Sequence, residues 1–146
     1  MRYLSTRGKA PPVTFSDVLL KGLAPDGGLY LPEQWPTFDI SDLQKRSGSE
    51  PTYESVAGEI IWPFVEGTFS RKELNDLIER AYATFTSQRI VPTKNFTDNL
   101  WLAELFHGPT LAFKDIALQL VGQFFDNQLE KSSERITIVG ATSGDT

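Results

Sequence analysis

The spacing of hydrophobic residues predicts a series of helices in the first ninety residues. The clearest covers residues 70–85, where apolar side chains recur every three or four positions after a Ser-x-x-Glu capping box that begins at Ser70. The same spacing predicts a buried helix over residues 52–64, with Pro63 as its stop signal. Shorter helices are predicted at residues 14–22 and 39–46, each with a polar capping residue before it.

The pattern changes near residue 93. The apolar run Leu100–Phe106 predicts a buried strand, and residues 135–139 predict a second one. Residues 115–129 between them predict an amphipathic helix. Its apolar face comprises Ile116, Leu120, Val121, Phe124 and Phe125. Because strands that alternate with a helix are typical of a parallel α/β sheet, we divide the chain into a mostly helical domain, residues 1–93, and the start of an α/β domain, residues 94–146.

Composition and charge narrow the classes of function. The chain of 146 residues has a net charge of −5, which does not favour nucleic-acid binding. It has no cysteine and a single histidine, so we expect neither disulfides nor a thiolate or histidine-rich metal site. No apolar run has the length of a signal peptide core or a membrane span. We therefore expect a cytoplasmic protein with no metal, membrane or nucleic-acid partner.

Lys114 is the candidate for chemistry, because it stands between apolar Phe113 and the predicted start of a helix. Burial and the positive end of a helix dipole both favour the neutral amine. A neutral lysine is a nucleophile that forms Schiff bases with carbonyl substrates or pyridoxal phosphate. The alternative is a surface lysine whose stem lies over Phe113 while Asp115 screens its charge. The local residues leave both interpretations open.

The final residues, Gly140-Ala-Thr-Ser-Gly-Asp-Thr146, have the composition of a ligand-binding loop that opens a helix. Backbone N–H groups and small hydroxyl groups at such a position suit a carboxylate. Because the sequence stops inside this loop, we expect it to be part of a longer protein.

Four segments taken together resemble threonine synthase, a family of enzymes that depend on pyridoxal 5'-phosphate. They are residues 3–8, 22–32, 104–119 and 141–146, and they contain the motifs Asp-Gly-Gly-Leu-Tyr-Leu-Pro, Glu-Leu-Phe-His-Gly-Pro-Thr, Phe-Lys-Asp and Ser-Gly-Asp-Thr. The resemblance implies a tryptophan-synthase-β-like fold, fold type II among such enzymes. It also implies the conversion of O-phospho-L-homoserine and water into L-threonine and phosphate, the final step of threonine biosynthesis.

The resemblance also implies roles for particular residues. Lys114 matches the lysine that carries the cofactor as a Schiff base and then acts as a base. The terminal loop is similar to the one that receives the substrate carboxylate and borders the cofactor. That loop comprises Ser143, Gly144, Asp145 and Thr146, of which Asp145 is also a cofactor-binding candidate.

Other residues of these motifs have two interpretations each. His107 either lines the site or is a turn histidine satisfied by backbone groups, and Thr110 is placed similarly. Asp115 either orients Lys114 or caps the helix. We interpret Arg7, Lys21 and the turn at residues 26–28 as structural, since their spacing alone does not connect them to a substrate phosphate.

The chain differs from the members of this family in its length. Because the glycine-rich loop for the cofactor phosphate is missing, we expect this chain to be inactive by itself and its strands to expose surfaces that favour association. The rival enzymes are related pyridoxal-phosphate lyases such as serine/threonine dehydratase or cysteine synthase. A catalytically inert interaction module is the rival from another class. The sequence leaves the oligomeric state open.

Overall fold

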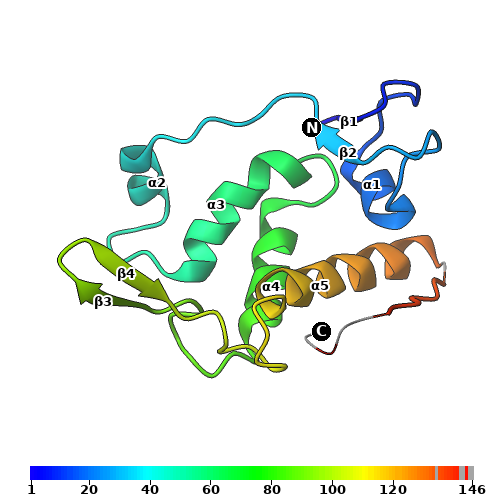
Figure 1. Ribbon diagram of the computed structural model, residues 1–146. Helices are drawn as coiled ribbons and strands as arrows, with labels where there is room; N and C mark the ends of the chain where they lie inside the picture. Colours follow the sequence, from blue (N-terminus) through cyan, green and yellow to red (C-terminus); the bar gives the residue numbers. More distant parts are fainter. Residues whose placement is uncertain (134, 142–143, 145–146) are drawn as a thin grey trace. The chain divides into compact units, whose positions relative to one another are not determined.

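The computed structural model describes residues 1–133, 135–141 and 144 (Figure 1). Its elements in order are β1 (Tyr3–Ser5), α1 (Phe15–Lys21), β2 (Tyr30–Pro32), α2 (Ile40–Arg46), α3 (Tyr53–Val65), α4 (Arg71–Tyr82), β3 (Thr93–Thr97), β4 (Leu100–Ala103) and α5 (Asp115–Ser132). The chain forms two compact units. We call residues 1–51 and 55–76 the N-terminal unit, and residues 52–54 and 77–146 the C-terminal unit.

The N-terminal unit is built around a short antiparallel ribbon. β1 pairs with β2 so that Leu4 lies opposite Leu31. Tyr3 is buried, and its hydroxyl donates to the carbonyl oxygen of Phe64 at 2.6 Å. Burial raises the pKa of Tyr3 to about 12, because the phenolate would lose its hydration. This single hydroxyl therefore ties the start of the chain to the end of α3.

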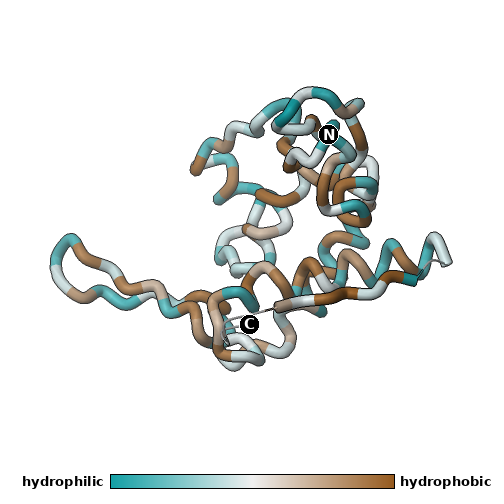
Figure 2. The backbone as a smooth tube through the Cα atoms, turned by 45° about the vertical axis from the view of Figure 1, so that its right-hand side comes forward, coloured by the Kyte–Doolittle hydropathy of each residue, from teal (hydrophilic) through white to brown (hydrophobic). Residues whose placement is uncertain are grey.

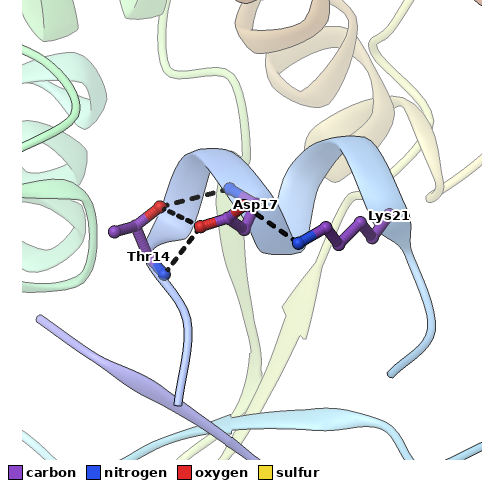
Figure 3. Close-up of polar contacts among 3 residues, drawn as sticks. All are labelled: Thr14, Asp17 and Lys21. Carbon is purple, nitrogen blue, oxygen red and sulfur yellow. Dashed lines mark hydrogen bonds and ion pairs between the residues drawn. The ribbon is translucent and has the colours of Figure 1, made fainter. Parts of the chain in front are cut away.

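The short helices of this unit begin at polar caps, as their sequences predict. Figure 3 shows the capping box of α1, in which Thr14 Oγ1 accepts from the Asp17 N–H and Asp17 accepts from the Thr14 N–H at 3.2 Å. Hydrogen bonds from Thr14, and then the ion pair with Lys21 at 3.0 Å, lower the pKa of Asp17. Lys21 is thus engaged in holding α1. The N-cap of α2 is Asp39, which accepts from the Ser41 and Asp42 N–H groups.

Of the two longer helices before residue 83, α4 agrees with its prediction, and α3 differs from its own in burial. α4 has the predicted capping box between Ser70 and Glu73, and it buries the predicted residues Leu74, Leu77, Ile78, Ala81 and Tyr82. α3, however, is only partly buried; Pro63 lies in its last turn, close to the end as predicted. The helix continues because the Glu66 N–H still reaches the Trp62 carbonyl at 3.0 Å.

The C-terminal unit contains α5, the longest helix. Its buried apolar residues are Leu120 and Phe124, while the other three predicted members of its apolar face, Ile116, Val121 and Phe125, are only partly buried. Tyr82, at the end of α4, donates its hydroxyl proton to the Ile116 carbonyl at 2.9 Å. Burial, and then the neighbouring Tyr53, raise the pKa of Tyr82 above its ordinary value. The first turn of α5 is therefore anchored from α4.

The predicted strands of the α/β domain need correction. Leu100–Phe106 is not a buried strand: only β4 is extended, and it pairs antiparallel with β3 in a hairpin whose residues are exposed. Figure 2 shows hydrophobic and hydrophilic segments alternating along this hairpin. Residues 135–139 form no strand, and Val139 is 90% exposed, because no described segment offers the backbone partners that a strand needs. The described residues form a mixed α/β structure whose two sheets are both antiparallel.

Candidate functional site

Lys114 lies where the sequence predicts, at the residue that immediately precedes α5. It is the N-cap of that helix, with helical φ and ψ of −62° and −25°, and its carbonyl accepts from the Ala117 and Leu118 N–H groups. The side chain is partly buried, and its Nζ lies 5.5 Å from the centre of the exposed Phe113 ring. A primary amine is thus held beside an aromatic ring with its backbone already helical.

Asp115 turns its carboxylate to the loop before it and to Gln119 in the next turn of α5. Its carboxylate is 3% exposed, and Oδ2 accepts from both the N–H and the Oγ1 of Thr110, at 2.8 and 2.9 Å. Oδ1 accepts from Gln119 Nε2 at 3.1 Å. Desolvation acts to raise the pKa of Asp115, but these hydrogen bonds outweigh it and hold the pKa below its ordinary value. We call this set of contacts the Asp115 clamp; it fastens the preceding loop to α5.

The loop inside the clamp depends on a close approach and on an unusual backbone angle. Gly108 is buried, and a Cβ at that position would overlap the side chain of Asp115, so only glycine fits. Leu111 has φ +61° although its side chain is 69% exposed, and its N–H closes a turn onto the Gly108 carbonyl at 3.2 Å. A left-handed leucine costs about 1 kcal/mol or more, and with this side chain largely in solvent, the clamp is what holds the turn.

The His107 ring is paired with a side chain, and not with the backbone groups of one of its two interpretations. Its Nε2 lies 2.9 Å from Glu104 Oε2, while its carbonyl accepts from the Thr86 N–H and hydroxyl. Glu104 is buried and also pairs with Lys94. Hydrogen bonds from Lys94, and then from His107, lower the pKa of Glu104. The signal that sequence reasoning missed is the acidic residue within the apolar run that begins at Leu100.

The remaining candidates of the site divide by position. Lys114, Thr110 and His107 lie in one loop, although the Thr110 hydroxyl is turned to Asp115 and the His107 ring to Glu104. Gly144 is exposed with φ +109°, whereas Ser143, Asp145 and Thr146 lie outside the described residues. Within the described part of the chain, no group of three or more His, Asp or Glu side chains is arranged to hold a metal ion, and no helix is long and apolar enough to cross a membrane.

The turn at residues 26–28 is organised like the Asp115 clamp. Asp26 Oδ1 accepts from the buried Ser5 hydroxyl at 2.6 Å and from the Gly28 N–H, and Oδ2 accepts from the Lys9 N–H. The Ser5 hydrogen bond is the main cause that lowers the pKa of Asp26. Arg7 donates to the Asp26 carbonyl at 2.9 Å. These contacts give the turn and Arg7 a structural role.

Comparisons with known proteins agree with the motifs. A family model described as threonine synthase N terminus matches residues 2–82. A threonine synthase of Pseudomonas aeruginosa is 47% identical over 146 residues, which is all of this chain and 31% of the relative. A mouse protein named threonine synthase-like 2 is 44% identical and is covered to 30%.

A solved structure gives the same result. The threonine synthase of Brucella melitensis, solved with pyridoxal phosphate bound, superposes with a TM-score of 0.86 and 42% identity, over 92% of this chain and 29% of that protein. The present chain thus spans about a third of the length of the relatives that it matches.

Proposed function

Because the chain belongs to the threonine synthase family, we propose that it supplies the cofactor-bearing lysine of an enzyme that converts O-phospho-L-homoserine and water into L-threonine and phosphate. The observation that carries this proposal is Lys114, a partly buried amine at the start of α5 behind a loop that the Asp115 clamp fastens. Lysines used for Schiff-base chemistry are held in such a way on rigid elements.

The proposed cofactor is pyridoxal 5'-phosphate, which the Brucella melitensis relative contains. Lys114 would hold this cofactor through its aldehyde group, for which a primary amine is the suitable partner. When bound, this cofactor withdraws electrons from the substrate carbon next to its amino group. Once released by the substrate amine, Lys114 would serve as the base that removes the proton from that carbon.

Substrate binding and the larger fold are further parts of the proposal. We assign the substrate carboxylate to the loop of Ser143, Gly144, Asp145 and Thr146, with Asp145 also beside the cofactor, on the grounds of the family motif and of the affinity of helix N-termini for anions. The similarity to whole threonine synthases supports a fold type II domain with a parallel sheet in the intact enzyme, for which residues 94–146 would supply the first part. A cytoplasmic location belongs to the same proposal.

A hybrid enzyme tests the function. This chain replaces the matching 31% of the Pseudomonas aeruginosa relative, and phosphate release from O-phospho-L-homoserine is measured. We expect turnover that falls at least about a thousandfold in Lys114→Ala, since both the cofactor linkage and the base are lost. Lys131→Ala, in the last turn of the same helix, is the control and should keep its activity.

Two results would contradict the proposal. One is a Lys114→Ala hybrid that still releases phosphate at the rate of the parent hybrid. The other is a hybrid that leaves O-phospho-L-homoserine intact but consumes threonine or O-acetylserine, which would indicate a related lyase. A soluble hybrid that binds no pyridoxal phosphate would favour a non-catalytic interaction module.

A further inference from the structure

We propose that Asp115 is a positioning residue for Lys114: its buried carboxylate sets the backbone from which the reactive amine extends. The inference rests on the proposed function of Lys114. Asp115 follows Lys114 directly, yet its carboxylate accepts hydrogen bonds from Thr110 and Gln119. The carboxylate thus acts through the chain on both sides of the lysine.

The clamp encloses the lysine within a closed stretch of backbone. Thr110 donates two hydrogen bonds to Asp115 Oδ2, so residues 110 and 115 are held together and Lys114 lies between them. Two further backbone bonds, from Asp115 N–H to the Ala112 carbonyl and from Ile116 N–H to the Phe113 carbonyl, tighten the same stretch. The Cα of Lys114 therefore has little freedom.

The strain in this loop shows that the clamp maintains a conformation that the sequence does not prefer. Leu111 adopts φ +61° with most of its side chain in solvent, so burial of that side chain does not repay the cost. Gly108 comes so close to Asp115 that no side chain would fit. Strained backbone that its surroundings hold in place is a recurring feature of active-site loops. Here the residue that holds the strain is the neighbour of the proposed nucleophile.

The ionised state of Asp115 strengthens this geometry. The donors of Thr110 and Gln119 point at a carboxylate that is almost fully buried, and hydrogen bonds to such a charged acceptor are stronger than those to a neutral one. Asp115→Asn removes the negative charge and leaves one acceptor oxygen where the carboxylate has two. The substitution therefore weakens the clamp while it hardly changes the size of the side chain.

The test uses the 146-residue chain and measures the reactivity of Lys114 directly. The protein is exposed to limiting pyridoxal phosphate, the Schiff bases are reduced with borohydride, and the labelled lysines are located by peptide mass spectrometry. In the wild type we expect Lys114 to label faster than Lys94 and Lys131. In Asp115→Asn we expect labelling of Lys114 to slow about tenfold, while labelling of Lys94 and Lys131 stays unchanged.

Three further variants separate positioning from general stability. Thr110→Val keeps the size of the side chain but loses the hydroxyl donor, and should reproduce part of the loss. Thr110→Ser keeps the donor and should restore labelling. Asp126→Asn changes an exposed carboxylate on the same helix and should have no effect. If circular dichroism shows that Asp115→Asn does not fold, the comparison of Thr110→Val with Thr110→Ser tests the positioning role instead.

The outcomes are distinct for the two proposals. A folded Asp115→Asn variant, or a Thr110→Val variant, whose Lys114 labels as fast as in the wild type overturns the positioning role. A wild type in which all lysines label equally contradicts the proposed function instead. Amide hydrogen exchange then tests the clamp independently of Lys114. Slower exchange of the Thr110 amide in the wild type than in Asp115→Asn supports the clamp, and equal exchange overturns it.

Discussion

The two units contain the same small device, a carboxylate that gathers a hydroxyl group and backbone N–H groups around a glycine. In the N-terminal unit, Asp26 accepts from the Ser5 hydroxyl, and Gly28 is packed so closely that a Cβ would overlap Ser5. In the C-terminal unit, Asp115 accepts from the Thr110 hydroxyl, and Gly108 is packed against Asp115 itself. Both devices fix a turn that side-chain packing alone would leave loose.

The difference lies in which residue has the positive φ. At the first turn it is Gly27, with φ +75°, for which the conformation has no steric cost. At the second it is Leu111, with φ +61°, for which it is strained. The relaxed turn is followed by a strand, β2, whereas the strained one is followed by Lys114. The same hydrogen-bonding pattern therefore stabilises a relaxed turn in one unit. In the other unit it holds a loop with a strained backbone beside the proposed nucleophile.

The largest expected effect comes from adding a methyl group at either glycine. Gly108→Ala should reduce the free energy of unfolding by about 2 kcal/mol, because the new Cβ overlaps Asp115 and α5 must shift. Gly28→Ala should cost about 2 kcal/mol as well, because the Ser5 hydroxyl would have to leave Asp26 and the Arg7 backbone nitrogen lies 3.1 Å from the new Cβ. Urea unfolding measures both. Equal stability of Gly108→Ala and the wild type would show that the loop is not closely packed on Asp115.

A matched pair of tyrosine variants compares the two long-range anchors. Tyr82→Phe and Tyr3→Phe each remove a hydroxyl that donates to a distant carbonyl, at Ile116 and Phe64 respectively, and each should cost about 1 kcal/mol. Only Tyr82→Phe should also slow the labelling of Lys114 by pyridoxal phosphate, because Ile116 lies in the first turn of α5. Slower labelling in Tyr3→Phe as well would mean that Lys114 responds to overall stability and not to its own anchor.

Sequence patterns were sufficient to predict the helices, because the capping residues and the apolar spacing lie within each helix or next to it. The capping box at Ser70 appears at the predicted position, and polar residues, Thr14 and Asp39, cap the two short helices as predicted. The apolar residues of α4 are buried as predicted, because a helical stripe needs no information beyond its own spacing. The strands could not be predicted in this way. Leu100–Ala103 pairs with residues 93–97 in a local hairpin, since pairing depends on which other segments are available.

Prediction of the site from the sequence was limited in the same way, because local patterns gave positions along the chain and not the partners of single side chains. The position of Lys114 before α5 followed from the Gly-Pro break and the helical pattern after it, and the structure confirms that position. The hydrogen-bond partners of Asp115 and His107 could not be predicted from the sequence. Hydrogen bonds between residues three to five positions apart depend on the path of the loop between them. The positive φ of Leu111 had no signal either, since leucine is not a residue that turns favour.

Alkaline pH provides a smaller test of the N-terminal anchor. The pKa of Tyr3 is about 12 in the folded chain, against about 10 for an unfolded one. Because the folded pKa is raised, the contribution of Tyr3 is complete below about pH 10 and is lost progressively as the pH rises toward 12. The Glu33 amide donates to the Arg2 carbonyl beside β1, and its protection from hydrogen exchange, relative to the intrinsic base-catalysed rate, should fall over this range. Tyr3→Phe should weaken that pH dependence; an unchanged dependence would assign it to other groups.

The smallest expected effect separates the strained turn from the relaxed one. Leu111→Gly removes the steric cost of the positive φ but gives the unfolded chain more freedom, and these terms of about 1 kcal/mol each nearly cancel. Because the leucine side chain is mostly exposed, little packing is lost, and the free energy of unfolding should change by less than about 0.5 kcal/mol. Gly27→Ala has no such compensation, since its Cβ would lie 2.9 Å from Arg7 Nη1 at φ +75°. A loss in Leu111→Gly as large as that in Gly27→Ala would show that Leu111 is held by contacts of its own side chain and that its backbone is not under strain.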